Sequence, residues 1–182
     1  MTILIILHIL GVVIGAGGAF AGDAMFFSSI RDKKISHTEM RFLKLSSTMV
    51  WTGIGIIVLS GIAIFLSDID HYFHSAKFLA KMTIVAIIII NGVIFHSIHL
   101  PRLHRHAESH FPSSDEFIRK TPYLIMSGAI SLVSWLSAFV LGFLEHPPFT
   151  YIEILGIYGI VLIIAISIGL MTKQHIFGTE EK

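Results

Sequence analysis

Phe78-Leu-Ala-Lys-Met-Thr-Ile-Val-Ala-Ile-Ile-Ile-Ile-Asn-Gly-Val-Ile94 is an apolar run with a single charged side chain, that of Lys81. A helix that crosses a bilayer needs about 20 predominantly apolar residues, and here the apolar character extends to Leu100. Together with four similar stretches, it predicts transmembrane helices at about residues 2–29, 42–66, 78–100, 123–144 and 150–172. The sequence therefore predicts an all-α fold, a polytopic membrane bundle of five helices that forms a single domain over residues 1–182.

The composition is that of a chain whose main partner is the lipid bilayer. Apolar residues make up 54% of the chain and charged residues 14%, whereas a soluble domain carries about 25% charged residues. The net charge of +1 gives no indication of a nucleic-acid partner. Cysteine is absent, which excludes disulfides, thiolate metal sites and covalently attached haem. Histidine occurs 11 times and is therefore the residue type most suited to carry a function.

Basic residues predict the orientation of the bundle. Nine of them lie after the first and third spans, at Arg31, Lys33, Lys34, Arg41, Lys44, Arg102, Arg105, Arg119 and Lys120. The segments on the opposite side contain only Lys77 and Lys81, both at the start of the third span. Because cytoplasmic segments of membrane proteins are enriched in Lys and Arg, we expect the N-terminus outside and the C-terminus in the cytoplasm.

Ionisable side chains inside the spans fall at two depths. His8 and Lys81 enter their helices from the outer side and form a predicted outer layer. Asp23 follows His8 by 15 residues, which is roughly 22 Å along a helix. It therefore reaches the depth of His96 and His99, the predicted inner layer. Charged groups are costly inside a bilayer and commonly mark a functional site.

The position of each of these residues can also be explained without a functional site. Lys81 can extend its ammonium to the membrane interface, and His96 and His99 can cap the end of their helix. Asp23 can pair with a basic residue at the interface. The sequence leaves these alternatives open.

Glycines line one side of the first span. Gly11, Gly15, Gly18 and Gly22 lie about 50° from His8 around the helix. Glycines at this spacing allow another helix to approach closely. In a second interpretation, a flat macrocycle lies on the glycine face while His8 supplies an axial nitrogen to a non-covalently bound haem.

Two His-x-x-His pairs indicate metal binding as a further candidate function. His71 with His74, and His96 with His99, place two imidazoles on one helical face, where they can share a metal ion. Imidazole suits copper, zinc, iron and nickel, so the pattern does not specify the metal. An exposed loop is the alternative for the first pair. The candidate metal-site residues are His71, His74, His146 and Asp23.

The outer layer carries a resemblance to known families. Leu7-His8-Ile9-Leu10-Gly11, with Gly17-Gly18, resembles the first helix of the copper-resistance D-type membrane proteins. Lys77-Phe78-Leu79-Ala80-Lys81-Met82 is similar to the start of one of their later helices. A similar His and Lys occur in the bacterial membrane-bound protoporphyrinogen oxidase family, whose members are associated with b-type haem. The resemblance covers about residues 5–100.

This resemblance implies His8 as a haem ligand, Lys81 as its functional companion and a multi-pass protein of the bacterial inner membrane. It does not extend to the oxidase family's aromatic and Pro-Arg segment after the glycines, where this chain reads Gly22-Asp23-Ala24-Met25-Phe26-Phe27. Porphyrinogen chemistry is therefore not part of the prediction.

The sequence leads to one functional prediction and two alternatives. We predict an integral membrane protein that binds haem b through His8, Lys81, His96 or His99, with copper as an additional metal, and that performs electron transfer or small redox chemistry. Its partner is then a redox protein or a quinone, and an oligomer is compatible with this function. The alternatives are a copper or other metal transporter, with Ser60, Asn91 and Ser131 as sparse polar steps, and an accessory subunit of a respiratory complex.

Overall fold

The computed structural model describes residues 2–31, 36–101, 115–144 and 147–177, and the regular elements within these ranges are all helical. In chain order they are α1 (Thr2–Arg31), α2 (His37–Ser67), α3 (Ile69–Phe73), α4 (Ala76–Ile94), the π-helical turn η1 (Phe95–His99), α6 (Asp115–Phe143) and α7 (Tyr151–Phe177).

Five segments are long and apolar enough to cross a membrane: Thr2–Ser28, His37–Ser67, Ala76–His99, Pro122–Phe143 and Tyr151–Thr172. The predicted all-α bundle with five membrane-spanning helices is therefore confirmed, and the chain is a multi-pass membrane protein.

Two helices begin earlier than the apolar stretches predicted. α2 starts at His37 because Ser36 and Glu39 form a capping box. The Ser36 hydroxyl accepts a hydrogen bond from the Glu39 N–H, and the Glu39 carboxylate accepts one from the Ser36 N–H. α6 starts at Asp115, so Pro122 lies inside a helix that extends beyond the membrane span. The length of an apolar stretch shows which part of a helix lies in lipid, whereas polar capping residues determine where the helix itself begins.

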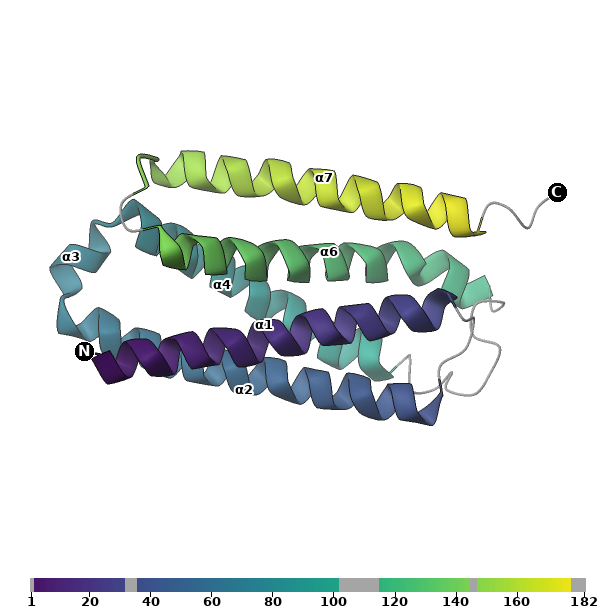
Figure 1. Cartoon of the computed structure of the whole chain (residues 1–182). Helices are drawn as coiled ribbons and strands as arrows, with labels where there is room; N and C mark the ends of the chain where they lie inside the picture. Colours follow the sequence, from purple (N-terminus) through teal and green to yellow (C-terminus); the bar gives the residue numbers. More distant parts are fainter. Residues whose placement is uncertain (1, 32–35, 102–114, 145–146, 178–182) are drawn as a thin grey trace.

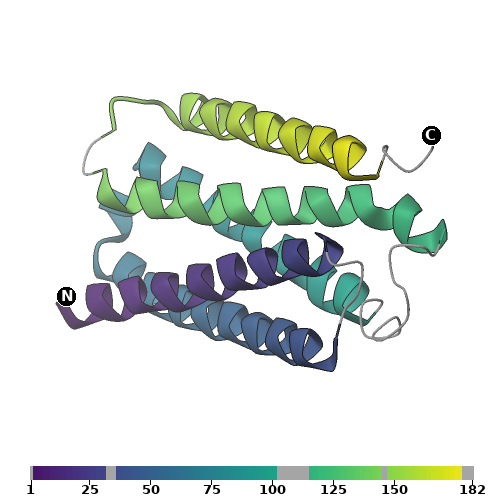
Figure 2. The ribbon, with the colours of Figure 1, turned by 45° about the vertical axis from the view of Figure 1, so that its right-hand side comes forward.

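The spans form two groups of helices. α1 lies beside α2, whereas α6 contacts α4 and α7, as both views of the ribbon show (Figures 1 and 2). The two groups meet where α1 contacts α6. The start of α1, the short helix α3 and the start of α7 lie at one end of the bundle (Figure 1). The end of α1, the start of α2 and the end of α7 lie at the other.

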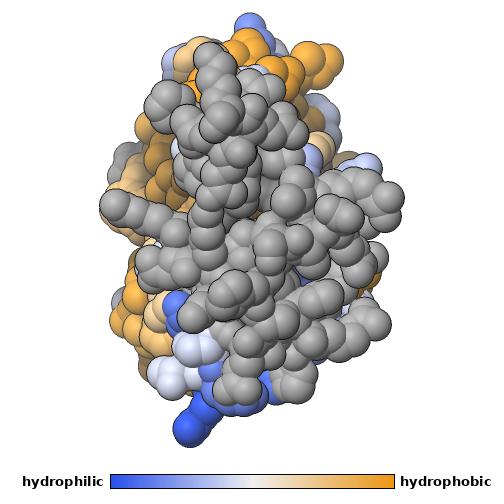
Figure 3. Space-filling view, turned by 90° about the vertical axis from the view of Figure 1, so that its right-hand side faces the viewer, coloured by the Kyte–Doolittle hydropathy of each residue, from blue (hydrophilic) through white to orange (hydrophobic). Residues whose placement is uncertain are grey.

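Figure 3 looks onto the end of the bundle where α1 and α7 finish. Among the described residues in this view, hydrophilic side chains gather near one edge and hydrophobic side chains form the flanks. The hydrophobic flanks fit a bundle whose sides contact lipid.

The first group is held together by glycines that bring two backbones into contact. A Cβ atom added to Gly53 would lie 2.5 Å from the Gly15 Cα atom, and one added to Gly18 would lie 2.9 Å from the Ser46 carbonyl oxygen. The Trp135 indole of α6 covers the same face, 2.4 Å from a Cβ atom added to Gly15. The glycine face is therefore closed by α2 and α6. The interpretation that a flat macrocycle lies on it is wrong, because helix backbones and an indole already fill that space.

We expect Gly53→Ala to destabilise the protein, because the added methyl group meets the Gly15 backbone, which cannot rotate away. Overpacking of this kind costs about 1–3 kcal/mol, which would appear as a lower melting temperature of the purified protein. Gly55→Ala is the matched control, since a Cβ atom at Gly55 meets nothing within 4 Å. Equal melting temperatures for the two variants would contradict the close contact of α1 and α2.

Candidate functional site

The outer polar layer is built around His8 of α1 and Ser60 of α2. The His8 Nδ1 atom lies 3.0 Å from the Ser60 Oγ atom. Ser60 Oγ also lies 2.5 Å from the carbonyl oxygen of Ile56, which can only accept a hydrogen bond. The single hydroxyl proton therefore goes to Ile56, and the hydroxyl oxygen accepts a hydrogen bond from Nδ1–H of His8. Ile57 presents a second backbone acceptor to this ring.

This arrangement assigns the proton of the neutral His8 ring to Nδ1. The Nε2 atom then carries a lone pair, which is the form of imidazole that binds a metal. Metal-ligating histidines commonly donate their other N–H to a fixed acceptor, which orients the ring. Ser60 and the α2 carbonyl groups supply such acceptors to His8.

Lys81 of α4 completes the outer layer. Its ammonium group is close enough to His8 to act on the imidazole electrostatically, as their predicted equal depth requires. Its neighbour Lys77 donates a hydrogen bond to the Leu144 carbonyl. Among the residues that the structure describes, Lys81 has no hydrogen bond and no acidic partner. Both His8 and Lys81 are half-buried. They lie within electrostatic range of each other, and the described residues place no anion beside the Lys81 ammonium group.

The inner polar layer surrounds a cavity of about 60 Å³, which we call the inner cavity. Its polar lining consists of Asp23, Ser46, Ser47, Asn91, Ser127 and Ser131. The chain has two tryptophans, Trp51 and Trp135, and both line this cavity. These residues come from α1, α2, α4 and α6, so the cavity lies between the two groups of helices.

Asp23 projects from α1 toward α6. A Cβ atom added to Gly128 would lie 3.7 Å from the Asp23 Oδ1 atom, and the Ser131 hydroxyl donates to the carboxyl group. The Oδ2 atom is buried and has no hydrogen-bond partner within the described part of the chain. The sequence anticipated an expensive carboxylate at this depth, and the structure brings it to a polar cavity between helices.

Other polar groups around the inner cavity are paired. Asn91 donates to the Ser127 carbonyl at 3.0 Å and accepts from the Ser127 hydroxyl at 2.9 Å, which joins α4 to α6. Nearer the middle of α6, Ser134 and the Tyr158 hydroxyl of α7 are 2.9 Å apart. Interhelical hydrogen bonds of this kind stabilise a membrane bundle by about 0.6 kcal/mol each on average. The Asn91–Ser127 pair fixes the wall of the cavity between α4 and α6.

The His-x-x-His pair near the inner end does not share a face. His96 is exposed, and its Nδ1 atom lies 3.0 Å from the Ser47 Oγ atom, whereas His99 is 6% exposed and its ring lies beside Phe95. The reason is the π-helical turn η1, whose wider turn separates residues that an α-helix would align. The expectation that an α-helical turn places both imidazoles on one face is therefore wrong for this pair.

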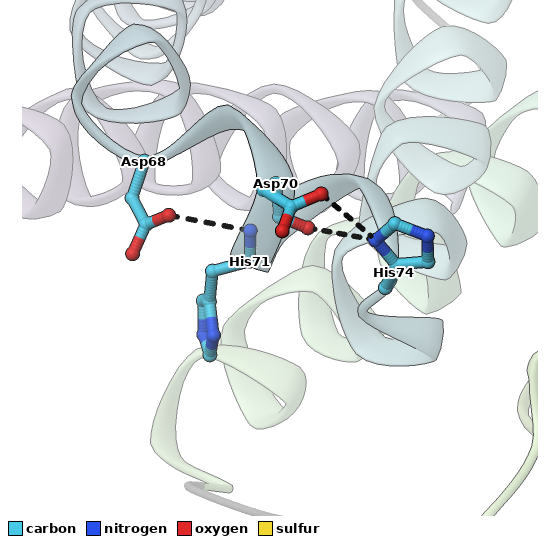
Figure 4. Close-up of polar contacts among 4 residues, drawn as sticks. All are labelled: Asp68, Asp70, His71 and His74. Carbon is cyan, nitrogen blue, oxygen red and sulfur yellow. Dashed lines mark hydrogen bonds and ion pairs between the residues drawn. The ribbon is translucent and has the colours of Figure 1, made fainter.

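The pair near the outer end belongs to the short helix α3, with His71 inside the helix and His74 at its C-cap. The His74 Nδ1 atom is 2.9 Å from the Asp70 carbonyl oxygen, and the Asp68 carboxylate caps the helix by accepting from the His71 backbone N–H. The two imidazole rings point in different directions (Figure 4). His146, the remaining predicted ligand, lies outside the described residues. Within those residues, no group of three or more His, Asp or Glu side chains is arranged to hold a metal ion.

An apolar layer separates the outer and inner polar layers. It contains Ala16 of α1, Ile54 of α2, Ile84 of α4 and Trp135 of α6, which are between 0% and 9% exposed. Ser60 lies with His8 on one side of this layer, and Asn91 and Ser131 lie at the inner cavity on the other. The polar steps expected of a transport route therefore form two separate clusters.

Sequence reasoning located His8, Lys81 and Asp23. It named Ser60 and Ser131 only as polar steps of a transport route, and it missed the other serines around these residues. Ser46 and Ser127 line the inner cavity, and Ser60 orients His8. A single serine in an apolar span is a weak signal, because its hydroxyl can donate to its own helix backbone. The seven-residue spacing of Ser46, Gly53 and Ser60 was the available signal, since it places all three on one side of α2.

No family model, curated protein or solved structure matches this chain. The geometry of the two polar layers is therefore the basis on which a function can be assigned.

We expect the neutral His8 ring to carry its proton on Nδ1, and Ser60→Ala to reduce the population of this tautomer by removing an acceptor. The ¹⁵N chemical shifts of the two ring nitrogens in the labelled protein measure this directly. Ser67→Ala is the control, because the Ser67 hydroxyl bonds only to Ile64 of its own helix. A wild-type ring protonated on Nε2 would contradict the assignment.

Proposed function

We propose that this chain is a protein of the bacterial inner membrane that binds haem b through His8 and takes part in electron transfer. The observation that carries the proposal is the electrostatic proximity of His8 on α1 and Lys81 on α4. An oriented imidazole thus lies near an ammonium group for which the described residues supply no counter-ion.

The chemistry of this pair suits a porphyrin better than a bare metal ion. Haem iron takes an axial imidazole nitrogen, and Nε2 of His8 carries the required lone pair. Haem propionates are carboxylates, which supply the anion that Lys81 lacks. A copper ion at His8 would instead be repelled by the neighbouring ammonium group. The absence of cysteine requires the haem to be non-covalently bound.

The inner cavity does not compete for this role. Its volume of about 60 Å³ is far below the 300–1,000 Å³ of pockets that hold larger organic ligands. The glycine face is closed as well. The proposal therefore concerns the outer layer, where His8 and Lys81 are both half-buried.

When bound, the haem iron supplies one-electron chemistry. The chain contributes the His8 imidazole, the hydroxyl and carbonyl groups of α2 that orient this ring, and the Lys81 charge. The apolar layer on the inner side keeps water away from that side of the site. We propose a quinone or a redox protein, approaching from the outer side, as the electron partner.

We expect His8→Ala to abolish the Soret absorption band of the protein purified from cells supplied with haem, because the axial nitrogen is lost. Lys81→Met should lower the haem content per chain, and Lys81→Arg should retain it because the positive charge is kept. Absorption spectra and haem content, normalised to protein, measure both effects.

His71→Ala is the matched control, since the exposed His71 lies on α3 away from the bundle interior; its spectrum should equal that of the wild type. An unchanged spectrum in a normally expressed His8→Ala protein would exclude His8 as the ligand. Bound copper without a Soret band in the wild type would exclude haem.

We further propose that the N-terminus is outside and the C-terminus is cytoplasmic. The support is the basic character of the chain at the end of the bundle where α1 finishes and α2 starts. Arg41 and Lys44 lie in the first turns of α2, and Lys33 and Lys34 precede them in the sequence. Positive residues are retained on the cytoplasmic side of bacterial membranes.

The absence of native cysteine makes this orientation simple to test. In whole cells, a membrane-impermeant maleimide should label Asp70→Cys on α3 and should not label Thr38→Cys at the start of α2. Both positions are exposed, and both should react after the cells are broken. Labelling of Thr38→Cys alone in intact cells would reverse the orientation.

A further inference from the structure

The inner cavity has a feature that the proposed haem function does not use. The Oδ2 atom of Asp23 is buried at the cavity and has no hydrogen-bond partner within the described part of the chain. A buried carboxylate without a partner is costly in water-soluble proteins and more so inside a membrane. Stable burial therefore requires a positively charged partner or a proton.

The lining supplies oxygen ligands and no basic side chain. Besides Asp23, the hydroxyl-bearing residues Ser46 and Ser131 line the cavity, and the Asn91 amide oxygen has a second lone pair beyond its bond to Ser127. Lys, Arg and His are absent from the described lining. Oxygen ligands without nitrogen or sulfur are the set that hard cations prefer.

Charge and size indicate which hard cation fits. One carboxylate is neutralised by one positive charge, which favours a monovalent cation. Calcium takes six to eight oxygen ligands, including several carboxylates, and magnesium requires near-ideal octahedral geometry. A single water needs about 10–15 Å³ of such space, so the cavity of about 60 Å³ has room for a small cation with a few waters. We infer that the inner cavity is a binding site for a monovalent cation of sodium size, with Asp23 as its charged ligand.

This site goes beyond the proposed haem function and is separate from it. The apolar layer with Ile84 and Trp135 lies between the inner cavity and His8. The cavity is lined by α1 and α2 from one group of helices and by α4 and α6 from the other. A cation held there joins the two groups at their inner end and favours the assembled bundle.

The two tryptophans give a direct readout, because both line the inner cavity and the chain has no others. We expect the tryptophan emission of the purified, haem-free protein to change and saturate on titration with sodium chloride. Choline chloride at the same ionic strength should cause no such change, because its cation is too large for the cavity.

Binding should also raise thermal stability. A ligand at one hundred times its Kd is expected to raise the Tm of a chain of this size by roughly 5–10 °C. Asp23→Asn keeps the shape of the side chain and removes its charge, so both sodium effects should be lost. Ser131→Ala should weaken the sodium response by at least severalfold, which provides a second variant if Asp23→Asn folds poorly.

Ser134→Ala is the matched control. Ser134 is a fully buried serine on α6 that pairs with Tyr158 and does not line the cavity. Its loss should lower Tm and leave the sodium-dependent shift intact. The haem spectrum of the Asp23→Asn protein should equal that of the wild type, so failure here is distinguishable from failure of the haem proposal.

Several results would overturn the inference. One is a wild-type protein whose emission and Tm respond equally to sodium and choline. Another is an Asp23→Asn protein that retains the full sodium response. A third is an Asp23→Asn protein that is as stable as the wild type both with and without sodium, because the carboxyl group would then be held as its protonated form.

Discussion

The contact between the backbones of Gly15 and Gly53 sets the register on which both polar layers depend. Gly15 lies seven residues, or about two helical turns, from His8, and Gly53 lies seven residues from both Ser46 and Ser60. In this antiparallel register the structure pairs His8 with Ser60, Gly15 with Gly53, and Gly22 with Ser46. In lipid, where apolar side chains gain nothing by leaving the solvent, helices associate through such close packing. A shift of α1 by one residue would separate His8 from Ser60 and turn Asp23 away from α6.

Apolar length, a property of each stretch alone, was sufficient to predict the five spans. The neighbourhood of His8 and Lys81 could also be anticipated, because depth follows from counting residues along helices that cross one bilayer. The partners of each helix face could not be anticipated, because they depend on which helices pack together. Thus the sequence left two interpretations for the glycines of α1, and the contacts of these glycines with α2 and Trp135 decide between them. The π-helical turn has no sequence signature here, and it alone separates His96 from His99.

The apolar layer between the two sites has a functional consequence of its own. A transporter needs a route lined by polar groups, whereas Ile84 and Trp135 place apolar side chains between the two polar layers, where the described polar pair is Ser134 with Tyr158. An electron carrier needs no continuous polar path and benefits from a dry barrier between its cofactor and the opposite side. The same layer therefore weakens the metal-transport alternative and agrees with a redox site confined to the outer half of the bundle.

Lys81 and Asp23 pose the same electrostatic problem with opposite signs. Each is an ionisable group inside the bundle, and the described residues give neither of them an oppositely charged partner. They do not neutralise each other, because the apolar layer lies between them and direct ion pairing requires contact within about 4 Å. Replacing either by a leucine would remove the burial cost at once, so a structural role alone gives no reason for the charge. The physical expectation is therefore that each charge is matched by a bound group of opposite sign, an anionic one in the outer layer and a cationic one in the inner cavity.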